Sequence, residues 1–201
     1  MIKVGILGGG QLGRMLLQEA ANYPMHVSVM ENDTECPSAK LCHQFVKGNI
    51  TNFEEVISFG KGLDVLTIEI ENVNVDALEE LEKTGVKVIP KPSALRTIKN
   101  KILQKEFYAK HEIPTSAFKI IKSKSELVDQ EDFLPAAHKL AMGGYDGKGV
   151  QLIHNKEEIH LGFDAPSVLE KMVDIQKEIA ITVAVAQDGS TAIYPPVEMV
   201  F

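Results

Sequence analysis

Four glycines and a lysine fall within seven positions, in the stretch Gly143-Gly144-Tyr145-Asp146-Gly147-Lys148-Gly149. Glycine lets backbone N–H groups approach a ligand closely, and lysine places a positive charge beside them. Strand-like runs flank the stretch, at Ala136–Leu140 and Val150–His154. We therefore expect residues 143–149 to form a glycine flap that folds over phosphate groups. A surface turn would explain one or two of these glycines, but it would not need all four together with Lys148.

Lys139 lies near the end of the strand that precedes the glycine flap. Phosphoryl transfer needs cations and N–H donors around the transferring group more than it needs a covalent catalyst. Lys139, Lys148 and the glycine backbone would supply both. The neighbouring His138 is expected on the opposite face of the strand, where it would have no ligand role.

A second glycine cluster, Gly8–Gly13, follows a strand pattern and precedes a helical one. Its spacing fits G-x-G-x-x-G, and Glu31 closes the next strand 18 residues after Gly13. This is close to a dinucleotide-binding pattern, in which an acid holds a ribose hydroxyl, so a nicotinamide or flavin oxidoreductase is one interpretation. Any strand–turn–helix that presents backbone N–H groups to an anion needs the same glycines, and so does a plain tight turn.

Two further strands end in acidic residues. In Thr67-Ile68-Glu69-Ile70-Glu71-Asn72, alternation places Glu69 and Glu71 on one face, at the sheet edge where open α/β folds bind ligands. The run Leu169–Val173, followed by Glu178, closes the other strand. Its backbone could read an adenine edge while a carboxylate holds the ribose hydroxyls. Solvated acids at strand ends are the alternative explanation for both.

Residues 1–92 alternate strands with helices, which indicates a parallel sheet covered on both sides. The expected strands are 2–8, 27–30, 44–47, 65–69 and 86–89. The first expected helix follows the glycine cluster and is stopped by Asn22-Tyr23-Pro24. Further helices are expected at about 37–44, 53–59 and 75–83. In the first helix the apolar residues recur at helical spacing, at Leu12, Met15, Leu16 and Ala20.

Residues 93–201 read as an α+β region with antiparallel pairing. Ser93 is expected to cap a helix that ends near Pro114, with an apolar stripe at Leu95, Ile98, Ile102 and Phe107. Strands are expected at 117–122, 136–140, 150–154 and 167–173, with helices near 125–132 and 156–162. Gln187-Asp188-Gly189-Ser190 is a hairpin signal between strands at 178–186 and 191–197.

The bulk composition limits the possible functions. Of 201 residues, 44% are apolar, yet no run is long enough for a membrane span, and the first residues enter a strand with no signal peptide. Cys36 and Cys42 fit neither a redox pair nor a disulfide framework, so we expect buried thiols in a cytoplasmic protein. The net charge of −7 argues against nucleic acid as a partner. Residues 91–124 nevertheless carry a net +7, which either focuses a small anion or forms a solvated helix face.

Taken in order, these segments resemble the ATP-grasp enzymes, and closely the family of N5-carboxyaminoimidazole ribonucleotide synthetases. The segments that carry the resemblance are Gly8–Met15, Thr67–Asn72, Gly143–Gly149, Leu169–Val173, and Tyr194-Pro195 with Glu198. The resemblance implies an α/β fold with a Rossmann-like, parallel-sheet pre-ATP-grasp domain at 1–92 that binds no dinucleotide. A linker helix and the α+β ATP-grasp lid subdomain would follow at 93–201, with the C-terminal part of the ATP-grasp fold missing.

The resemblance also implies a reaction. ATP would phosphorylate bicarbonate to carboxyphosphate, which then carboxylates the amine of 5-aminoimidazole ribonucleotide in purine biosynthesis. The enzyme would be an ATP- and Mg²⁺-dependent carbon–nitrogen ligase, a homodimer that acts on small molecules and has no nucleic-acid or membrane partner. Relatives continue past residue 201 into the part that bears the Mg²⁺ ligands, so no metal ligand is expected within this chain. A non-catalytic ATP-binding fragment and an NAD(P)-dependent oxidoreductase using the cluster 8–13 remain as alternatives.

The residues carried over from the family form three groups. The catalytic group lies in the flap and comprises Tyr145, Asp146 and Lys148. The ATP-binding group comprises Lys101, Lys139, Gly144, Gly147, Gly149, Glu170, Lys171, Met172, Val173 and Glu178. The group that faces the aminoimidazole nucleotide comprises Gly10, Gln11, Leu12 and Glu71.

The chain departs from the family pattern at four positions. Lys101 stands where an arginine is usual, in a Gln-Asp-Arg-x-x-x-Lys pattern whose last lysine is matched by Lys105. Lysine cannot make the bidentate fork of arginine, so this contact is expected to be weaker. Val150 replaces a glutamine, Val185 an arginine and Met199 an asparagine.

Overall fold

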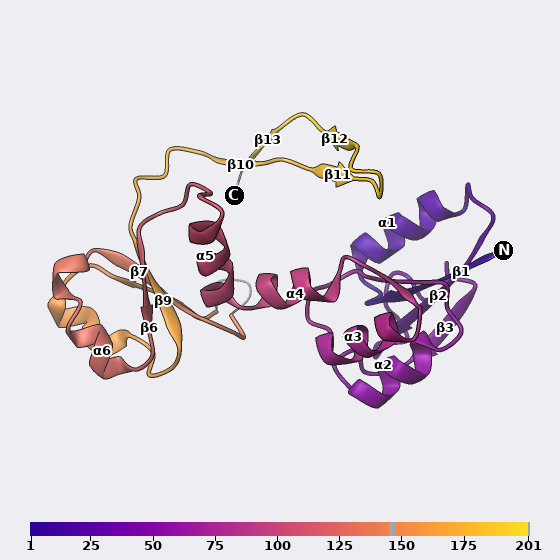
Figure 1. Ribbon diagram of the computed structural model, residues 1–201, viewed down its shortest axis with the longest axis horizontal. Helices are drawn as coiled ribbons and strands as arrows, with labels where there is room; N and C mark the ends of the chain where they lie inside the picture. The colour runs from indigo at the N-terminus through magenta and orange to yellow at the C-terminus, as the bar shows by residue number, and fades with distance from the viewer. Residues whose placement is uncertain (145–147, 201) are drawn as a thin grey trace.

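The computed structural model describes residues 1–144 and 148–200. The chain forms two lobes joined by a helix, α4 (Pro92–Lys99), and its last strands run back from the second lobe toward the first (Figure 1). The first lobe contains the N-terminus, and the second contains the ends of the glycine flap.

The first lobe is built on a five-stranded sheet whose parallel pairing confirms the expectation from its alternating strands and helices. The strand order is β3-β2-β1-β4-β5. Its strands are β1 (Ile2–Leu7), β2 (Met25–Glu31), β3 (Gln44–Lys47), β4 (Val65–Ile68) and β5 (Lys87–Ile89). Its helices are α1 (Gln11–Ala20), α2 (Phe53–Gly60) and α3 (Val75–Lys83). The largest core cluster joins Leu7, Leu66 and Val88 of the strands to Leu78 and Leu81 of α3.

The prediction of a helix at about 37–44 is wrong, because this segment forms a series of turns. Ser38, which is fully buried, donates its backbone N–H to the carbonyl of Gly9 and its hydroxyl to the carbonyl of Gly10. Free thiols are confirmed nearby: Cys36 is buried, while Cys42 is only half-buried. The segment therefore follows the contour of the first glycine cluster instead of its own helical pattern.

The single long helix expected after Ser93 is also wrong, because it is divided into α4 and α5 (Lys101–Lys110). Asn100 between them has an extended backbone, and its side chain accepts hydrogen bonds from the N–H groups of Ile102 and Leu103. An asparagine cap of this kind starts a new helix with a new direction. Ser93 lies inside α4, whose cap position is Lys91, followed by Pro92.

The second lobe has a four-stranded antiparallel sheet in the order β6-β9-β7-β8, which confirms the expected α+β character. Its strands are β6 (Phe118–Ile121), β7 (Ala136–Leu140), β8 (Val150–Ile153) and β9 (Ser167–Lys171). The helix expected at 125–132 is shorter, at α6 (Lys124–Val128) with a 3-10 turn η1 (Glu131–Phe133), and the segment η2 (Lys156–Leu161) is a 3-10 helix. A separate core holds Ile121, Leu127, Ile153 and Leu169.

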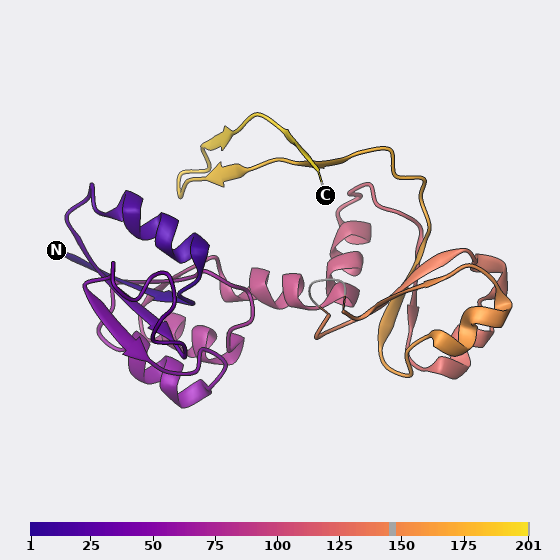
Figure 2. The same ribbon diagram turned by 180° about the vertical axis from the view of Figure 1, so that it is seen from behind.

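The last strands form two small antiparallel pairs, β10 (Glu178–Ala180) with β13 (Val197–Met199) and β11 (Val183–Val185) with β12 (Thr191–Ile193). The expected hairpin turn is confirmed between β11 and β12, where Gly189 has a φ of +84°. The hairpin reaches back to the first lobe (Figure 2). There, Lys87 Nζ donates to Gln187 Oε1 at 3.0 Å. Within the described ranges, no helix is long and apolar enough to cross a bilayer.

Candidate nucleotide-binding site

The antiparallel sheet of the second lobe brings Lys139 and Glu170 together. Glu170 of β9 pairs with Ala137 of β7, two residues from Lys139, so both side chains project from the same face. Helix α5 packs against β9 and adds Lys105 from that side. Lys139 Nζ lies 3.2 Å and Lys105 Nζ 3.1 Å from Glu170 Oε2. The sheet thus holds a cluster of two cations and one carboxylate at the end of the strand that enters the flap.

The carboxyl group of Glu170 is ionised within this cluster. Burial raises the pKa of Glu170, but the charges of Lys139 and Lys105 outweigh burial and hold the pKa below its usual value. Ser116 adds a hydroxyl that donates to the same oxygen, Oε2, at 3.1 Å. The side chain of Lys139 remains 29% exposed, so its ammonium group is accessible to a ligand from solvent.

The two ends of the glycine flap meet in a space that only glycine fits. A Cβ built on Gly144 would lie 2.7 Å from the backbone oxygen of Lys148, and one on Gly149 would lie 2.9 Å from the Cα of Gly144. Gly149 also has a φ of +81°, in the left-handed region. Local geometry alone therefore requires glycine at positions 144 and 149.

Lys101 connects α5 to the base of the flap. Its backbone N–H donates to the carbonyl of Ala141 at 2.8 Å, and its Nζ donates to the carbonyl of Gly144 at 3.4 Å. Lys101 therefore contacts the flap base from a helix, while Lys139 lies in the strand that leads into the flap. Lys148 lies within the flap and is exposed, whereas Tyr145, Asp146 and Gly147 lie outside the described residues.

The segment expected to bracket adenine, residues 170–173, begins at Glu170 in β9 and continues past the end of that strand at Lys171. The side chain of Lys171 points to the η1 segment, where its Nζ donates to the carbonyls of Phe133 and Leu134 at 3.1 and 2.8 Å. The N–H groups of Lys171 and Met172 bond to the carbonyls of Ala117 and Pro135. Because these groups serve the lobe itself, Lys171 would not offer its ammonium group to a nucleotide.

Val173 and Glu178 lie where the chain leaves the sheet. Val173, two residues after the end of β9, is 60% exposed. Glu178 opens the exposed β10–β13 pair, and the structure does not bring it to the cluster of Lys105, Lys139 and Glu170.

The first glycine cluster packs around two side chains from other segments. A Cβ on Gly10 would lie 2.6 Å from Glu69 Oε1, and one on Gly9 would lie 2.4 Å from Cys36 Sγ. The N–H of Gly9 donates to Glu31 Oε2 at 3.3 Å. These glycines are thus explained by close packing, and the acid that a dinucleotide's ribose would need is bonded to the loop itself.

The remaining substrate-binding candidates lie at the rim of the first lobe. Gln11 and Leu12 begin α1 and are exposed. Glu71 is exposed too, and its charge acts on Lys99, whose Nζ donates to the carbonyl of Val73 at 2.7 Å. Burial lowers the pKa of Lys99, and Glu71 partly offsets this effect.

Sequence reasoning missed three contributors: the ion pair of Lys105 with Glu170, the hydroxyl of Ser116, and the packing of Glu69 against the first glycine loop. Glu69 had a usable signal, because alternation places it on the same face as Glu71. Lys105 was marked only as the last lysine of a family pattern, and neither its pairing with Glu170 nor the role of Ser116 had a signal, since Glu170 lies on a strand distant in sequence. His138 lies as expected on the other face of β7, where it is fully buried and bonded to Ser167 Oγ.

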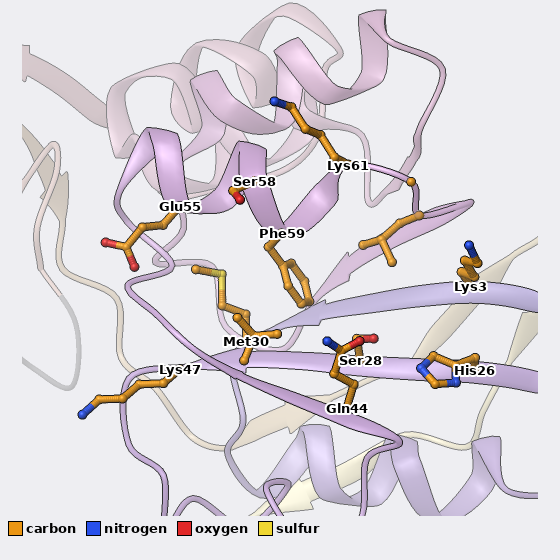
Figure 3. Close-up of a pocket in the computed structure, with 13 residues that line it drawn as sticks. Lys3, His26, Ser28, Met30, Gln44, Lys47, Glu55, Ser58, Phe59 and Lys61 are labelled. Atoms are coloured by element: carbon orange, nitrogen blue, oxygen red, sulfur yellow. The ribbon is translucent and has the colours of Figure 1, made fainter.

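A separate hollow lies elsewhere, on the face of the first sheet beside α2 (Figure 3). It measures about 620 Å³, with Ser28 and Gln44 on the strands and Phe59 of α2 opposite. None of the candidate ATP-binding or substrate-binding residues lines it. Among the described residues, no group of three His, Cys, Asp or Glu side chains could hold a metal ion.

Both halves of the chain match known domain families. The ribonucleotide synthetase preATP-grasp domain matches residues 1–99, and the ATP-grasp domain matches residues 106–200. Together with the two-lobed fold and the lysine cluster beside a glycine flap, these matches place the chain in the ATP-grasp superfamily, to which it belongs.

Individual proteins similar to this chain carry more specific names than the two domain families. A protein of Vigna aconitifolia, named phosphoribosylaminoimidazole carboxylase, chloroplastic, is 38% identical, and the match covers 98% of this chain and 37% of the plant protein. The crystal structure of N5-carboxyaminoimidazole ribonucleotide synthetase from Thermotoga maritima is 34% identical with a TM-score of 0.90, covering 99% of this chain and 54% of its own. The synthase of Aspergillus clavatus, solved with ADP and 5-aminoimidazole ribonucleotide, is 32% identical with a TM-score of 0.87, covering 100% and 54%. The chain thus spans about half the length of these solved relatives.

Proposed function

We propose that this chain binds ATP in its second lobe and 5-aminoimidazole ribonucleotide at the rim of its first lobe. It would do so as part of a ligase that makes N5-carboxyaminoimidazole ribonucleotide from bicarbonate. The overall reaction would consume ATP and give ADP and phosphate. The proposal extends to this chain what the names of its relatives say of them.

One observation carries the nucleotide part of the proposal. Lys101 contacts the base of a glycine flap from α5, while Lys139 lies in β7, the strand that leads into the flap, where Glu170 of β9 fixes its ammonium group. Cations and backbone N–H groups are what a triphosphate needs, and the exposed part of Lys139 faces solvent. The ends of the flap are narrow enough to require glycine at 144 and 149.

The oxidoreductase alternative has less support. Glu31 would have to release the N–H of Gly9 before it could accept a ribose hydroxyl. Glu69 also places a carboxylate against Gly8 and Gly10, where the pyrophosphate of a dinucleotide would meet negative charge. Both features favour a first lobe that binds a ligand other than NAD(P).

Titration of the chain with ATP and, separately, with NADH tests the nucleotide class. We expect ATP to bind, and Lys139→Ala to weaken it by about 10- to 100-fold, the loss expected when one charged hydrogen bond is removed. Lys119→Ala, at an exposed position on β6 of the same sheet, is the matched control and should leave the affinity unchanged. Binding of NADH without ATP would replace this proposal by the oxidoreductase.

Phosphate release tests the reaction. In the longest natural form of the protein, release should require 5-aminoimidazole ribonucleotide and bicarbonate together. ATP binding without such release would leave the chain as a non-catalytic ATP-binding protein. The proposal includes Mg²⁺ bound together with ATP, with its protein ligands outside the residues named above. It also includes a homodimer and a cytoplasmic location.

A further inference from the structure

Lys105 is the only lysine that is buried among the described residues, with 5% of its surface exposed. Its Nζ donates to Thr115 Oγ1 at 2.6 Å and to Ser116 Oγ at 3.5 Å, and it lies 5.7 Å from the centre of the Phe118 ring. Placing an ammonium group in such surroundings is unfavourable unless a partner compensates. That partner is Glu170, at 3.1 Å.

One oxygen of Glu170, Oε2, is shared by three groups. Lys105, Lys139 and Ser116 all lie 3.1 to 3.2 Å from Oε2. The two lysines and the carboxylate together carry one net positive charge. The side chain of Lys139 is 29% exposed, whereas that of Lys105 is buried. Of the two lysines, only Lys139 can therefore touch a ligand.

We propose that Lys105 is a positioning residue that shares the Glu170 carboxylate, so that Glu170 fixes Lys139 in place without cancelling its positive charge. This inference rests on the proposed function for the identity of the ligand, a nucleoside triphosphate. Lys105 itself does not contact that ligand.

The physical reason is a matter of charge. A carboxylate at hydrogen-bond distance immobilises a lysine, but in a buried pair the two charges also cancel at longer range. A second buried cation on the same carboxylate keeps the immobilisation and restores the net charge. Because the cluster is shielded from solvent, salt screens this effect less than it would at the surface.

A charge-restoring pair of variants tests the proposal. Lys105→Met removes the buried cation with little change in shape, which leaves Lys139 and Glu170 as a neutral pair. Adding Glu170→Gln to it removes the carboxylate charge and returns the cluster to one net positive charge. Lys110→Met removes an exposed lysine from the end of the same helix and serves as the control.

The measurement is the affinity for ATP divided by the affinity for adenosine, so that any change in adenine recognition cancels. We expect Lys105→Met to lower this ratio by at least about tenfold, the order of effect that one unit charge has across a poorly screened site. The double variant should recover most of the loss, and Lys110→Met should show none. If Lys105 had only a structural role, the ratio should fall further in the double variant.

An unchanged ratio in folded Lys105→Met, or no recovery in the double variant, would overturn the proposal. If the unaltered chain bound no ATP, the proposed function would fail. A second measurement, made without ligand, would still test whether Lys105 shares the Glu170 carboxylate. In that measurement, ¹³C NMR follows the titration of the Glu170 carboxyl group. The pKa of Glu170 should rise in Lys105→Met and stay constant in Lys110→Met, and an equal pKa in both would refute the shared carboxylate.

Discussion

Gly149 and Gly144 approach each other so closely at the base of the flap that a Cβ on Gly149 would lie 2.9 Å from the Cα of Gly144. The carbonyl of Gly149 also accepts a hydrogen bond from the N–H of Leu140 at 2.9 Å. The flap is therefore closed at its base by backbone contacts, and a side chain at either position would force the two ends apart.

Gly149→Ala should weaken ATP binding by about tenfold or more, because it displaces the flap from Lys101 and Lys139. The left-handed backbone adds a cost of about 1–2 kcal/mol for a non-glycine residue. Gly189→Ala is a matched control, since Gly189 has a φ of +84° but no atom within 4 Å of an added Cβ. Titration calorimetry on both variants measures the effect. Equal ATP affinities in the two would show that the narrow flap base has no part in binding.

Lys101→Arg should tighten ATP binding by roughly threefold to tenfold. Lys101 makes one long side-chain contact, 3.4 Å to the carbonyl of Gly144, whereas an arginine presents a planar fork suited to phosphate oxygens. Lys110→Arg at the exposed end of the same helix controls for general effects of arginine. Weaker binding in Lys101→Arg would mean that the compact ammonium group fits this position better.

Gly10→Ala should destabilise the first lobe by about 1–3 kcal/mol, the cost of overpacking a filled site. Gly10 has a φ of −72°, so crowding by Glu69 Oε1 is the cause and backbone strain is not. Urea unfolding of Gly10→Ala, Glu69→Ala and the double variant measures the coupling. Because Glu69→Ala empties the space that the new methyl group needs, the double variant should be more stable than the sum of the single changes predicts. Strict additivity would contradict this packing.

Much of the fold could be predicted from the sequence because it depends on local periodicity. The parallel sheet followed from apolar runs separated by helical patterns, and the hairpin near Gly189 followed from its turn residues. The break at Asn100 also had a local signal, since asparagine is a strong helix cap, although the continuous apolar stripe concealed it. The turns around Ser38 had no such signal, because that residue is held by the carbonyls of Gly9 and Gly10.

The site was predictable in part for the same reason. Glycine spacing and Lys139 lie within one hairpin-like segment, so the sequence indicates their neighbourhood directly. The pairing of Lys105 with Glu170 depends on how α5 packs against β9, which no local pattern encodes. The stripe of Leu12, Met15 and Leu16 shows the opposite limit, because these residues are 44 to 64% exposed and α1 buries Gly13 and Leu17 instead. Periodicity identifies an apolar face, but not the surface that covers it.

His138 should make the second lobe sensitive to acid. The N–H of Phe163 donates to its Nδ1 at 3.3 Å, so Nε2 carries the proton and donates to Ser167 Oγ at 2.6 Å. Burial lowers the pKa of His138 from 6.5, the value we expect in the unfolded chain. The folded state therefore binds this proton less readily than the unfolded state. The resulting contribution to stability is complete above about pH 6.5 and is lost as the pH falls toward the folded pKa.

We expect the free energy of unfolding to fall between pH 7.5 and 5.5, with His138 contributing at most about 1.4 kcal/mol per pH unit. His138→Gln should be less stable at pH 7.5 but show a shallower pH dependence, because it has no proton to take up on unfolding. His154→Gln, at an exposed position after β8, should retain the slope of the unaltered chain. Urea unfolding at several pH values measures all three. If the slope in His138→Gln equalled that of the unaltered chain, the acid sensitivity would have to arise from another group.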